Sequence, residues 1–244
     1  MKKILVPTLI ALSLGSVSGL AQAQAAAPES SLSFNVGVTS DYRYRGISQS
    51  RLQPALQGGV DYADKSGFYV GAWGSSIKWI KDGGGDASVE LDLYGGYKGA
   101  VGDVAYDVGF LRYEYPSNKL ATNANTNEIY GAVTFGPATL KYSHAISNLF
   151  GVANSKNSYY VDLSGTFDLG NGFSLVPHVG YQSVRNNASA SYTDYSLTLS
   201  KDLGNGLSAT AALVGTDADK SVYYTPAGKF TGKSGVVVGL KYAF

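Results

Sequence analysis

The charged motif Asp41-Tyr42-Arg43-Tyr44-Arg45 is the part of the sequence whose residue types and spacing point most directly to chemistry. Alternate residues of an extended strand face the same side, so the three charged side chains would share one face, with the two guanidinium groups about 7 Å apart. Such a pair could bind a carboxylate, sulfate or phosphate group on a passing solute. The arginines could equally pair with Asp41 and with acidic residues of neighbouring strands. The sequence leaves both interpretations open.

The two histidines are the candidates for acid–base catalysis. A hydrolytic triad brings a serine, a histidine and a polar orienting group together. His144 shares the outward-facing parity of Tyr142 and has no serine two residues away on that face. His178 is on the inward-facing parity with Ser174 and Gln182, without a carboxylate in its own strand. Because neither strand forms a triad by itself, we expect no enzymatic activity, with a lipid-modifying enzyme as the alternative.

Composition argues against several other kinds of site. The 244-residue chain has no cysteine, which excludes cysteine-based zinc sites and thiol catalysis, and with two histidines we expect neither a metal ion nor a cofactor. Gly83-Gly84-Gly85 lacks the following Lys-Ser/Thr of a phosphate-binding loop. The net charge of +1 falls to −1 without Lys2 and Lys3, so we expect no nucleic-acid partner. With 31 glycines, 19 tyrosines and 15% charged residues, the composition is typical of a β-rich exported protein.

The first 25 residues have the three parts of a secretory signal peptide. Lys2 and Lys3 form the positive region, residues 4–20 are apolar or small, and residues 21–25 offer small-x-small cleavage sites. We expect cleavage after Ala23 or Ala25 and a mature domain over 26–244. A membrane-anchor helix would need a longer unbroken apolar stretch.

Beyond residue 30, apolar and polar residues alternate with a period of two, which predicts β-strands and no helices. Twelve segments show the alternation: 31–45, 53–63, 67–80, 87–98, 103–115, 126–135, 138–148, 157–168, 173–185, 191–201, 207–217 and 233–244. Tight glycine-rich turns alternate with longer polar loops along the chain. An even number of strands, with short turns at one end and long loops at the other, predicts an antiparallel up-and-down β-barrel of the outer-membrane type.

Aromatic residues support a membrane barrel because they gather near the two ends of the predicted strands. The belt beside the tight turns comprises Phe34, Tyr62, Phe68, Tyr97, Tyr106, Phe135, Phe167, Phe173, Tyr242 and Phe244. The belt beside the long loops comprises Tyr42, Tyr44, Trp79, Tyr113, Tyr142, Tyr159, Tyr181 and Tyr192. A soluble β-protein also alternates, but it has no reason to sort its aromatic residues into two rings.

Two segments fit this plan poorly. Segment 67–80 has large apolar residues on both faces, so its parity stays open. In segment 103–115, Arg112 and Glu114 would face lipid if the alternation continued. Either a bulge near Leu111 or a strand that extends beyond the bilayer would resolve the conflict.

Residues 34–49, 54–62 and 67–73, which include FNVGVTSDYRYRGISQ, PALQGGVDY and GFYVGAW, resemble the opening of the TorF family, whose members are assigned as porins. The likeness is specific over 34–73, and the rest of the chain agrees in strand plan and length. Ser75-Ser76 departs slightly from the family pattern. The resemblance implies an outer-membrane barrel and supplies no established substrate.

The last six residues, Gly239-Leu240-Lys241-Tyr242-Ala243-Phe244, resemble the terminal-strand signal read by the barrel-assembly machinery. That resemblance implies a recognition role for Gly239, Tyr242 and Phe244. The alternative is a last strand that merely has an apolar face.

The inward parity of the predicted strands gives candidate pore-lining residues: Asp41, Arg43, Arg45, Asp61, Glu90, Asp92, Lys98, Asp107, Glu128, Lys141, Asp162, Asp168, Asp194 and Lys241. Nine are acidic and five basic, which favours a mild preference for cations in a hydrated passage. The same charges could instead pair across the lumen and close it.

We therefore expect an outer-membrane porin for small hydrophilic solutes, embedded in outer-membrane lipid and assembled by the barrel machinery. The sequence makes no prediction of its oligomeric state. The alternative is a non-conducting barrel that acts as an anchor or as a surface-interaction protein through loop 218–232.

Overall fold

The computed structural model describes residues 29–244, so the expected signal peptide over 1–25 lies outside the described residues. The wall strands are β1 (Ser31–Thr39), β4 (Ala55–Ala63), β5 (Phe68–Ser76), β6 (Val89–Val101), β7 (Val104–Glu114), β8 (Thr126–Phe135), β9 (Ala138–Ala145), β10 (Tyr159–Gly165), β11 (Phe167–Gly170), β12 (Phe173–Ser183), β13 (Tyr192–Gly204), β14 (Leu207–Thr216) and β15 (Gly235–Ala243). The loops carry the short strands β2 (Arg43–Tyr44) and β3 (Ile47–Ser48), the one-turn helix α1 (Trp79–Asp82) and a 3₁₀ turn (Ala188–Ala190). Within residues 29–244, no helix is both long enough and apolar enough to span a bilayer.

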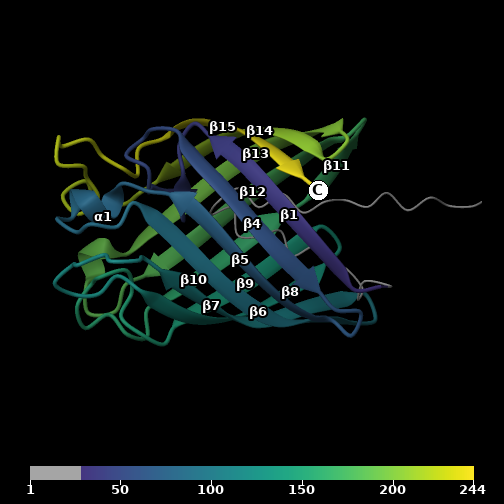
Figure 1. Ribbon diagram of the computed structural model, residues 1–244, viewed down its shortest axis with the longest axis horizontal. Coiled ribbons are helices and arrows are strands. Elements are labelled where there is room, and N and C mark those ends of the chain that lie inside the picture. The colour runs from purple at the N-terminus through teal and green to yellow at the C-terminus, as the bar shows by residue number, and fades with distance from the viewer. Residues whose placement is uncertain (1–28) are drawn as a thin grey trace, which may run out of the picture.

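These strands close into a single antiparallel barrel (Figure 1). Strands β4 to β10 and β11 to β15 each pair with the next along the chain, β1 pairs with β4 and with β15, and β10 pairs with β12. Strands β10 and β11 follow one another around Thr166 and together cross the wall once. We call each such crossing a stave, and the wall has the predicted twelve staves. The strand count and the antiparallel order predicted from the sequence are confirmed.

Main-chain hydrogen bonds close the seam between the two ends of the chain. Val36 lies opposite Tyr242 and Thr39 opposite Gly239 in the β1–β15 pair. The N–H of Phe34 donates to the carbonyl of Phe244 at 2.8 Å, and the N–H of Phe244 donates back at 3.0 Å. A barrel that closes in this way leaves no edge strand exposed to lipid.

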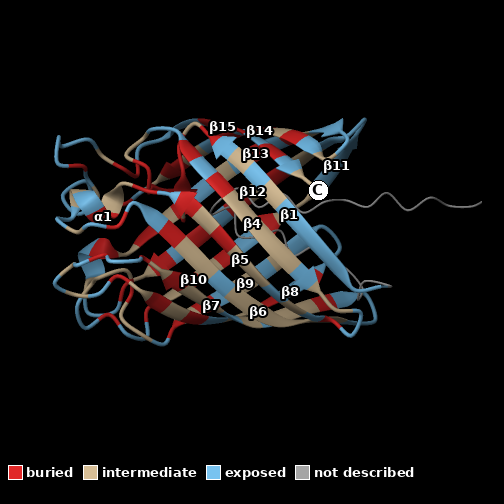
Figure 2. Ribbon diagram, viewed as in Figure 1, coloured by how far each residue is buried: buried red, intermediate tan, exposed pale blue. Residues whose placement is uncertain are grey.

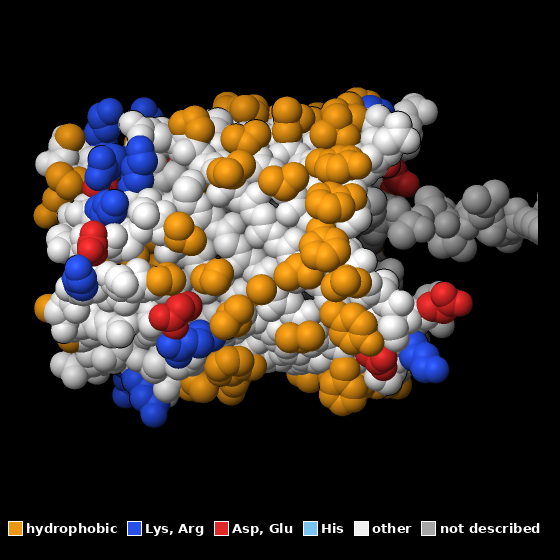
Figure 3. All heavy atoms as spheres, in the orientation of Figure 1, with side chains coloured by type: hydrophobic (Ala, Val, Ile, Leu, Met, Phe, Trp, Pro, Cys, Tyr) orange, Lys and Arg blue, Asp and Glu red, His pale blue; other side chains and the backbone are white. Residues whose placement is uncertain are grey.

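The outer surface is apolar and the inner surface is polar. On β13, Tyr195, Leu197 and Leu199 face outward and are 50%, 41% and 40% exposed, while the inward Thr198 and Ser200 are buried. Buried and exposed positions alternate along the staves in Figure 2. Hydrophobic side chains cover the outer wall in Figure 3, and most of the charged side chains visible on this face lie towards the two ends. This arrangement suits a protein whose outer wall contacts lipid.

The aromatic belt at the tight-turn end lies on the outer wall as expected, with Phe34, Phe68 and Phe135 exposed. The predicted belt at the long-loop end is largely wrong. Of that set, Tyr142, Tyr159 and Tyr181 lie side by side on the outside, but Tyr42, Tyr44, Trp79, Tyr113 and Tyr192 lie inside or in loops packed over the lumen. The inward side chains at this end are large and aromatic, and the period-two pattern does not show which of two apolar faces meets lipid.

The orientation of the side chains on β5 and β7, which the sequence left open, is clear in the structure, and neither strand contains a bulge. On β5, Trp73 faces the lumen, while Phe68 and Val70 face outward. Strand β7 keeps an unbroken register with both of its neighbours, and Arg112 and Glu114 pair at 2.5 Å near its loop end. Both side chains of that pair are partly exposed, as expected where a strand extends past the apolar band.

A matched pair of substitutions on β13 tests the two faces. Leu197→Arg places a charge on the outer wall near the middle of the strand, and we expect it to lower the free energy of unfolding by about 2–4 kcal/mol in liposomes. The neighbouring Ser196→Arg faces the lumen and should cost far less. Denaturant titration of both variants measures the difference. Equal losses would contradict the assignment of the faces.

Candidate functional site

Segment 40–54 folds into the loop end of the barrel instead of extending its wall. The sequence predicts a strand over 31–45, but β1 ends at Thr39, and Arg43 to Ser48 form the small hairpin β2–β3. Most of residues 41–50 are buried. The prediction failed because the alternation of charged and aromatic residues continues past the point where the chain leaves the sheet.

The hairpin turn depends on Gly46. Arg45 and Gly46 both have positive φ, +46° and +77°, which reverses the chain direction. A Cβ atom on residue 46 would lie 2.4 Å from Cγ2 of Thr216 and 2.7 Å from Cβ of Asp194. Only glycine tolerates both this backbone and this close approach to β13 and β14.

Asp41 and Arg43 form a local network that stabilises the inward-folded segment. The Nε of Arg43 lies 2.5 Å from Oδ2 of Asp41. Ser48 and Ser50 donate to Oδ1 of the same carboxylate at 2.5 and 3.1 Å. Nη1 of Arg43 donates to the carbonyl of Thr231 at 3.1 Å, which joins the segment to the loop before β15. These contacts of Asp41 and Arg43 match the interpretation in which the motif forms ion pairs within the protein.

Arg45 reaches from the segment to two walls of the barrel. Its Nη2 donates to Oε2 of Glu128 on β8 at 2.8 Å, and its Nη1 donates to Oε1 of Gln182 on β12 at 2.6 Å. The guanidinium carbon also lies 4.3 Å from the ring centroid of Tyr160 and 4.8 Å from that of Tyr44. This buried side chain narrows the lumen at the level of Glu128.

Tyrosines on the inner wall hold several of the predicted lumen carboxylates. Tyr94 donates to Asp61 at 2.5 Å, and Tyr69 donates to Asp107 at 2.6 Å. Nζ of Lys98 lies 3.9 Å from the carboxylate of Asp107. Sequence reasoning selected the charged residues and missed these tyrosines, although their inward parity was a signal that could have identified them.

His178, on β12, contacts carboxylates on the two strands that flank it. Its Nε2 lies 2.6 Å from Oδ2 of Asp162 on β10, and its Nδ1 lies 3.6 Å from Oδ1 of Asp194 on β13. The hydroxyl of Tyr160 donates to Asp194 at 2.9 Å and lies 3.1 Å from His178. The acidic partners come from neighbouring strands, which explains why the sequence of β12 alone did not show them.

The remaining candidate residues occupy two kinds of position. Glu90, Asp92, Lys141 and Lys241 lie on inward-facing positions, with Lys141 over the ring of Tyr130 at 4.2 Å. Asp168 needs a correction: it is exposed at the tight-turn end, where its Oδ1 accepts the N–H of Gly170 at 2.8 Å. Its strand β11 ends in a turn that lies at the rim, so inward parity does not bring it into the passage.

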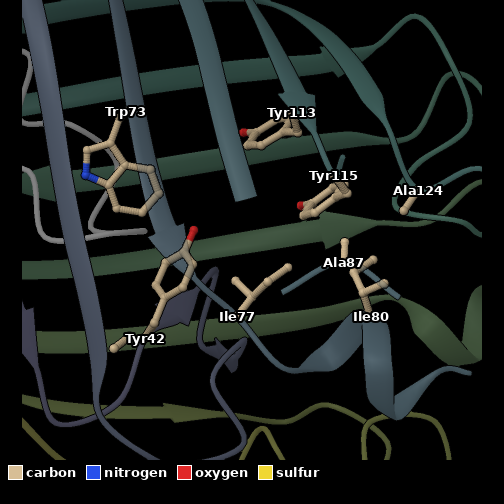
Figure 4. Packing of buried hydrophobic residues seen from close by; sticks show 9 residues of the cluster. Tyr42, Trp73, Ile77, Ile80, Ala87, Tyr113, Tyr115 and Ala124 are labelled. Atoms are coloured by element: carbon tan, nitrogen blue, oxygen red, sulfur yellow. The ribbon is translucent and has the colours of Figure 1, made fainter. Parts of the chain in front are cut away.

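A group of aromatic side chains closes over Glu90 at the loop end. We call Tyr42, Trp73, Tyr113 and Tyr115 the ring cluster; Ile77, Ile80, Ala87 and Ala124 pack beside it (Figure 4). Tyr42 meets Trp73 edge-on, with ring centroids 5.5 Å apart, and its hydroxyl donates to Oε1 of Glu90. Burial, followed by the nearby carboxylates, raises the pKa of Tyr42 and of Tyr115 well above the usual value, so both hydroxyls stay protonated.

Neither histidine belongs to a triad among the described residues. The outward His144 contacts the Tyr142 hydroxyl at 2.9 Å and Asn157 at 3.3 Å. The contacts of His178 are with Asp162, Asp194 and Tyr160. In residues 29–244, no group of three or more His, Asp or Glu side chains is arranged to hold a metal ion.

A family model described as "Bacterial protein of unknown function (Gcw_chp)" matches residues 22–244. The chain belongs to this family. The comparison with curated proteins found no match. Among solved structures, the chain resembles the KdgM porin at 8% identity, with a TM-score of 0.56 over 88% of this chain and 99% of that one. It also resembles the NanC porin at 10% identity, with a TM-score of 0.52 over 88% and 99%. At these identities the likeness shows the shared barrel fold.

The buried Arg45–Glu128 pair gives a testable energetic coupling. Arg45→Met removes one partner and leaves Glu128 buried without its cation, so we expect a loss of about 3 kcal/mol in the free energy of unfolding. Adding Glu128→Gln should recover most of that loss. A double-mutant cycle by denaturant titration in detergent measures the coupling. Additive effects of the two substitutions would show that the pair does not secure the segment.

Proposed function

We propose that the protein is an outer-membrane channel for the passive diffusion of small hydrophilic solutes. The observation that carries this proposal is the inverted polarity of the closed barrel, which has apolar side chains outside and carboxylates, hydroxyls and lysines inside. A twelve-stranded wall is intermediate between small barrels filled by side chains and wide sixteen-stranded porins. Such a lumen suits a narrow solute.

In this proposal, segment 40–54 forms the constriction of the channel. Its tip residue Arg45 is tied to β8 and β12, and its Arg43 is tied to the loop before β15. The position of the segment determines how much of the lumen stays open. The excess of carboxylates on the inner wall supports a weak preference for cations.

Export by the predicted signal peptide, cleavage after Ala23 or Ala25 and insertion by the barrel-assembly machinery are part of the same proposal. The closing strand β15 places Gly239 on the inner face and Tyr242 on the outer face beside β1. Phe244 pairs with Phe34 at the seam. These positions suit a terminal-strand signal. The resemblance to the TorF porins and the names of the KdgM and NanC porins support the same class of protein.

A non-conducting barrel is the second candidate, and one observation favours it. Three clusters of buried apolar residues, centred on Tyr42, Leu149 and Tyr192, pack the loops over the lumen. If these loops stay in place, the barrel would serve as an anchor or as a surface-interaction protein.

Planar-bilayer recordings of the mature protein distinguish the two candidates. We expect discrete conductance steps from the wild-type barrel. Replacing residues 43–48 with Asn-Gly removes the hairpin, while Tyr42 and Gln49, which share a main-chain hydrogen bond of 2.7 Å, can still be joined. This variant should give steps several-fold larger, because the constriction is gone.

A gel mobility that changes on heating verifies that both proteins are folded barrels. Conductance steps of equal size in the wild type and the variant would show that segment 40–54 does not form the constriction. If neither folded protein conducts, the channel function is contradicted. Conductance steps from the variant alone would support the non-conducting barrel.

A further inference from the structure

Glu90 and Asp92 are two carboxylates on the same inner face of β6, beneath the loops. Glu90 is 1% exposed. Asp92 lies directly opposite Trp73 on β5 and Tyr113 on β7. Because residues directly opposite in an antiparallel pair have Cβ atoms about 5 Å apart, the Asp92 carboxylate is flanked by an aromatic side chain on each side. We call Glu90 and Asp92 the carboxylate pair.

The rings of the ring cluster lie beside both members of the carboxylate pair. In Figure 4, Tyr42 and Trp73 lie on one side, Tyr113 and Tyr115 lie on the other, and the tyrosine hydroxyls point towards the space between them. Tyr42 donates to Oε1 of Glu90, and the Tyr115 hydroxyl also interacts with Glu90. Oδ1 of Asp92 is buried and accepts no hydrogen bond from any described residue. One acceptor in this space is therefore unsatisfied by the described chain.

Five other carboxylates at this end of the barrel pair with a cation, and Asp217 and Asp219, which do not, are exposed to water. The ion pairs are Arg43–Asp41, Arg45–Glu128, Arg51–Asp82, Arg112–Glu114 and Lys119–Asp86. None of the ion pairs in the described part of the chain includes Glu90 or Asp92. The carboxylate pair thus brings two acidic side chains together without a described cation beside them. Removing a carboxylate from water without a counter-charge is costly, so a proton or a bound cation must compensate it.

The surroundings favour an organic ammonium ion as that cation. The faces of tryptophan and tyrosine rings attract cations, and the attraction grows when water is excluded. Here Trp73 and Tyr113 flank Asp92, and the hydroxyls of Tyr42 and Tyr115 contact Glu90. An ammonium group bearing methyl or methylene carbons can meet the rings with its carbons and the carboxylates with its charge. A compact hydrated ion gains less from the rings.

We propose that the carboxylate pair and the ring cluster form a binding site for organic ammonium ions in the lumen. Interpreting this site as one that selects solutes rests on the proposed channel function, because a cation that binds here would lie beside the Arg45 constriction. Organic amines are then the class of solute that the lumen favours, and organic anions are disfavoured by the same two carboxylates.

The chain carries its own reporter for this site. Its only two tryptophans are Trp73, in the ring cluster, and Trp79, which packs on Tyr115. A cation that binds beside the carboxylate pair changes the surroundings of both indoles. Intrinsic fluorescence therefore reads out the site without a label, and the measurement needs no current through the barrel.

The test is a titration of the detergent-folded mature protein with tetramethylammonium chloride, with sodium chloride at equal ionic strength as the reference. We expect a saturable change in tryptophan emission with tetramethylammonium chloride and no such change with sodium chloride. The double variant Glu90→Gln/Asp92→Asn should weaken that binding at least tenfold. The matched control is Asp107→Asn, a lumen carboxylate that already has Tyr69 and Lys98 as partners, and it should bind like the wild type.

Heat-dependent gel mobility verifies that each variant is a folded barrel, and Trp79→Phe, which leaves Trp73 as the sole reporter, should keep the response. Two results would overturn the proposal: no saturable change beyond that of sodium chloride, as expected if a shared proton neutralises the carboxylates, or unchanged binding in the double variant. Failure of the channel function would appear separately, as folded barrels that bind tetramethylammonium but stay silent in planar bilayers.

Discussion

In a bilayer, each backbone N–H and C=O of a spanning strand has to find its partner in a neighbouring strand, because lipid offers none. The pairing of β1 with β15 meets this requirement for the two strands that would otherwise be edges. Once the ring is closed, every stave has one face towards lipid and one towards the axis. The outward Leu, Val and Phe side chains and the inward carboxylates, hydroxyls and tyrosines follow from that division.

Closure also creates the setting for the polar chemistry inside. Charged groups in the lumen are partly removed from water, so they lie in contact with partners from other strands or from the inward-folded segment. Arg45 meets Glu128 and Gln182, and His178 meets Asp162 and Asp194. Glu90 and Asp92 differ, since aromatic rings surround them and no described cation pairs with them. We expect the solute selectivity of the lumen to depend on Glu90 and Asp92.

Much of the barrel could be predicted because period-two alternation and glycine-containing turns are local signals. The twelve staves and their order came from those signals, whereas the path of residues 40–54 did not. Asp41, Arg43 and Arg45 keep the alternation of a strand, and only the contacts of Gly46 with Thr216 and Asp194 show why the chain turns inward. Likewise, the partners of His178 lie on other strands, and their proximity depends on register, which a single strand does not encode.

The most direct measurement of the inverted barrel is a spin-label accessibility scan along β13 in liposomes. The chain has no cysteine, so single cysteines at residues 195–200 can each carry one nitroxide. Labels at 195, 197 and 199 should be relaxed by oxygen dissolved in the lipid, and labels at 196, 198 and 200 should be shielded from it. A scan without this alternation, or with the opposite phase, would contradict a barrel whose apolar side chains face lipid and whose polar side chains face the axis.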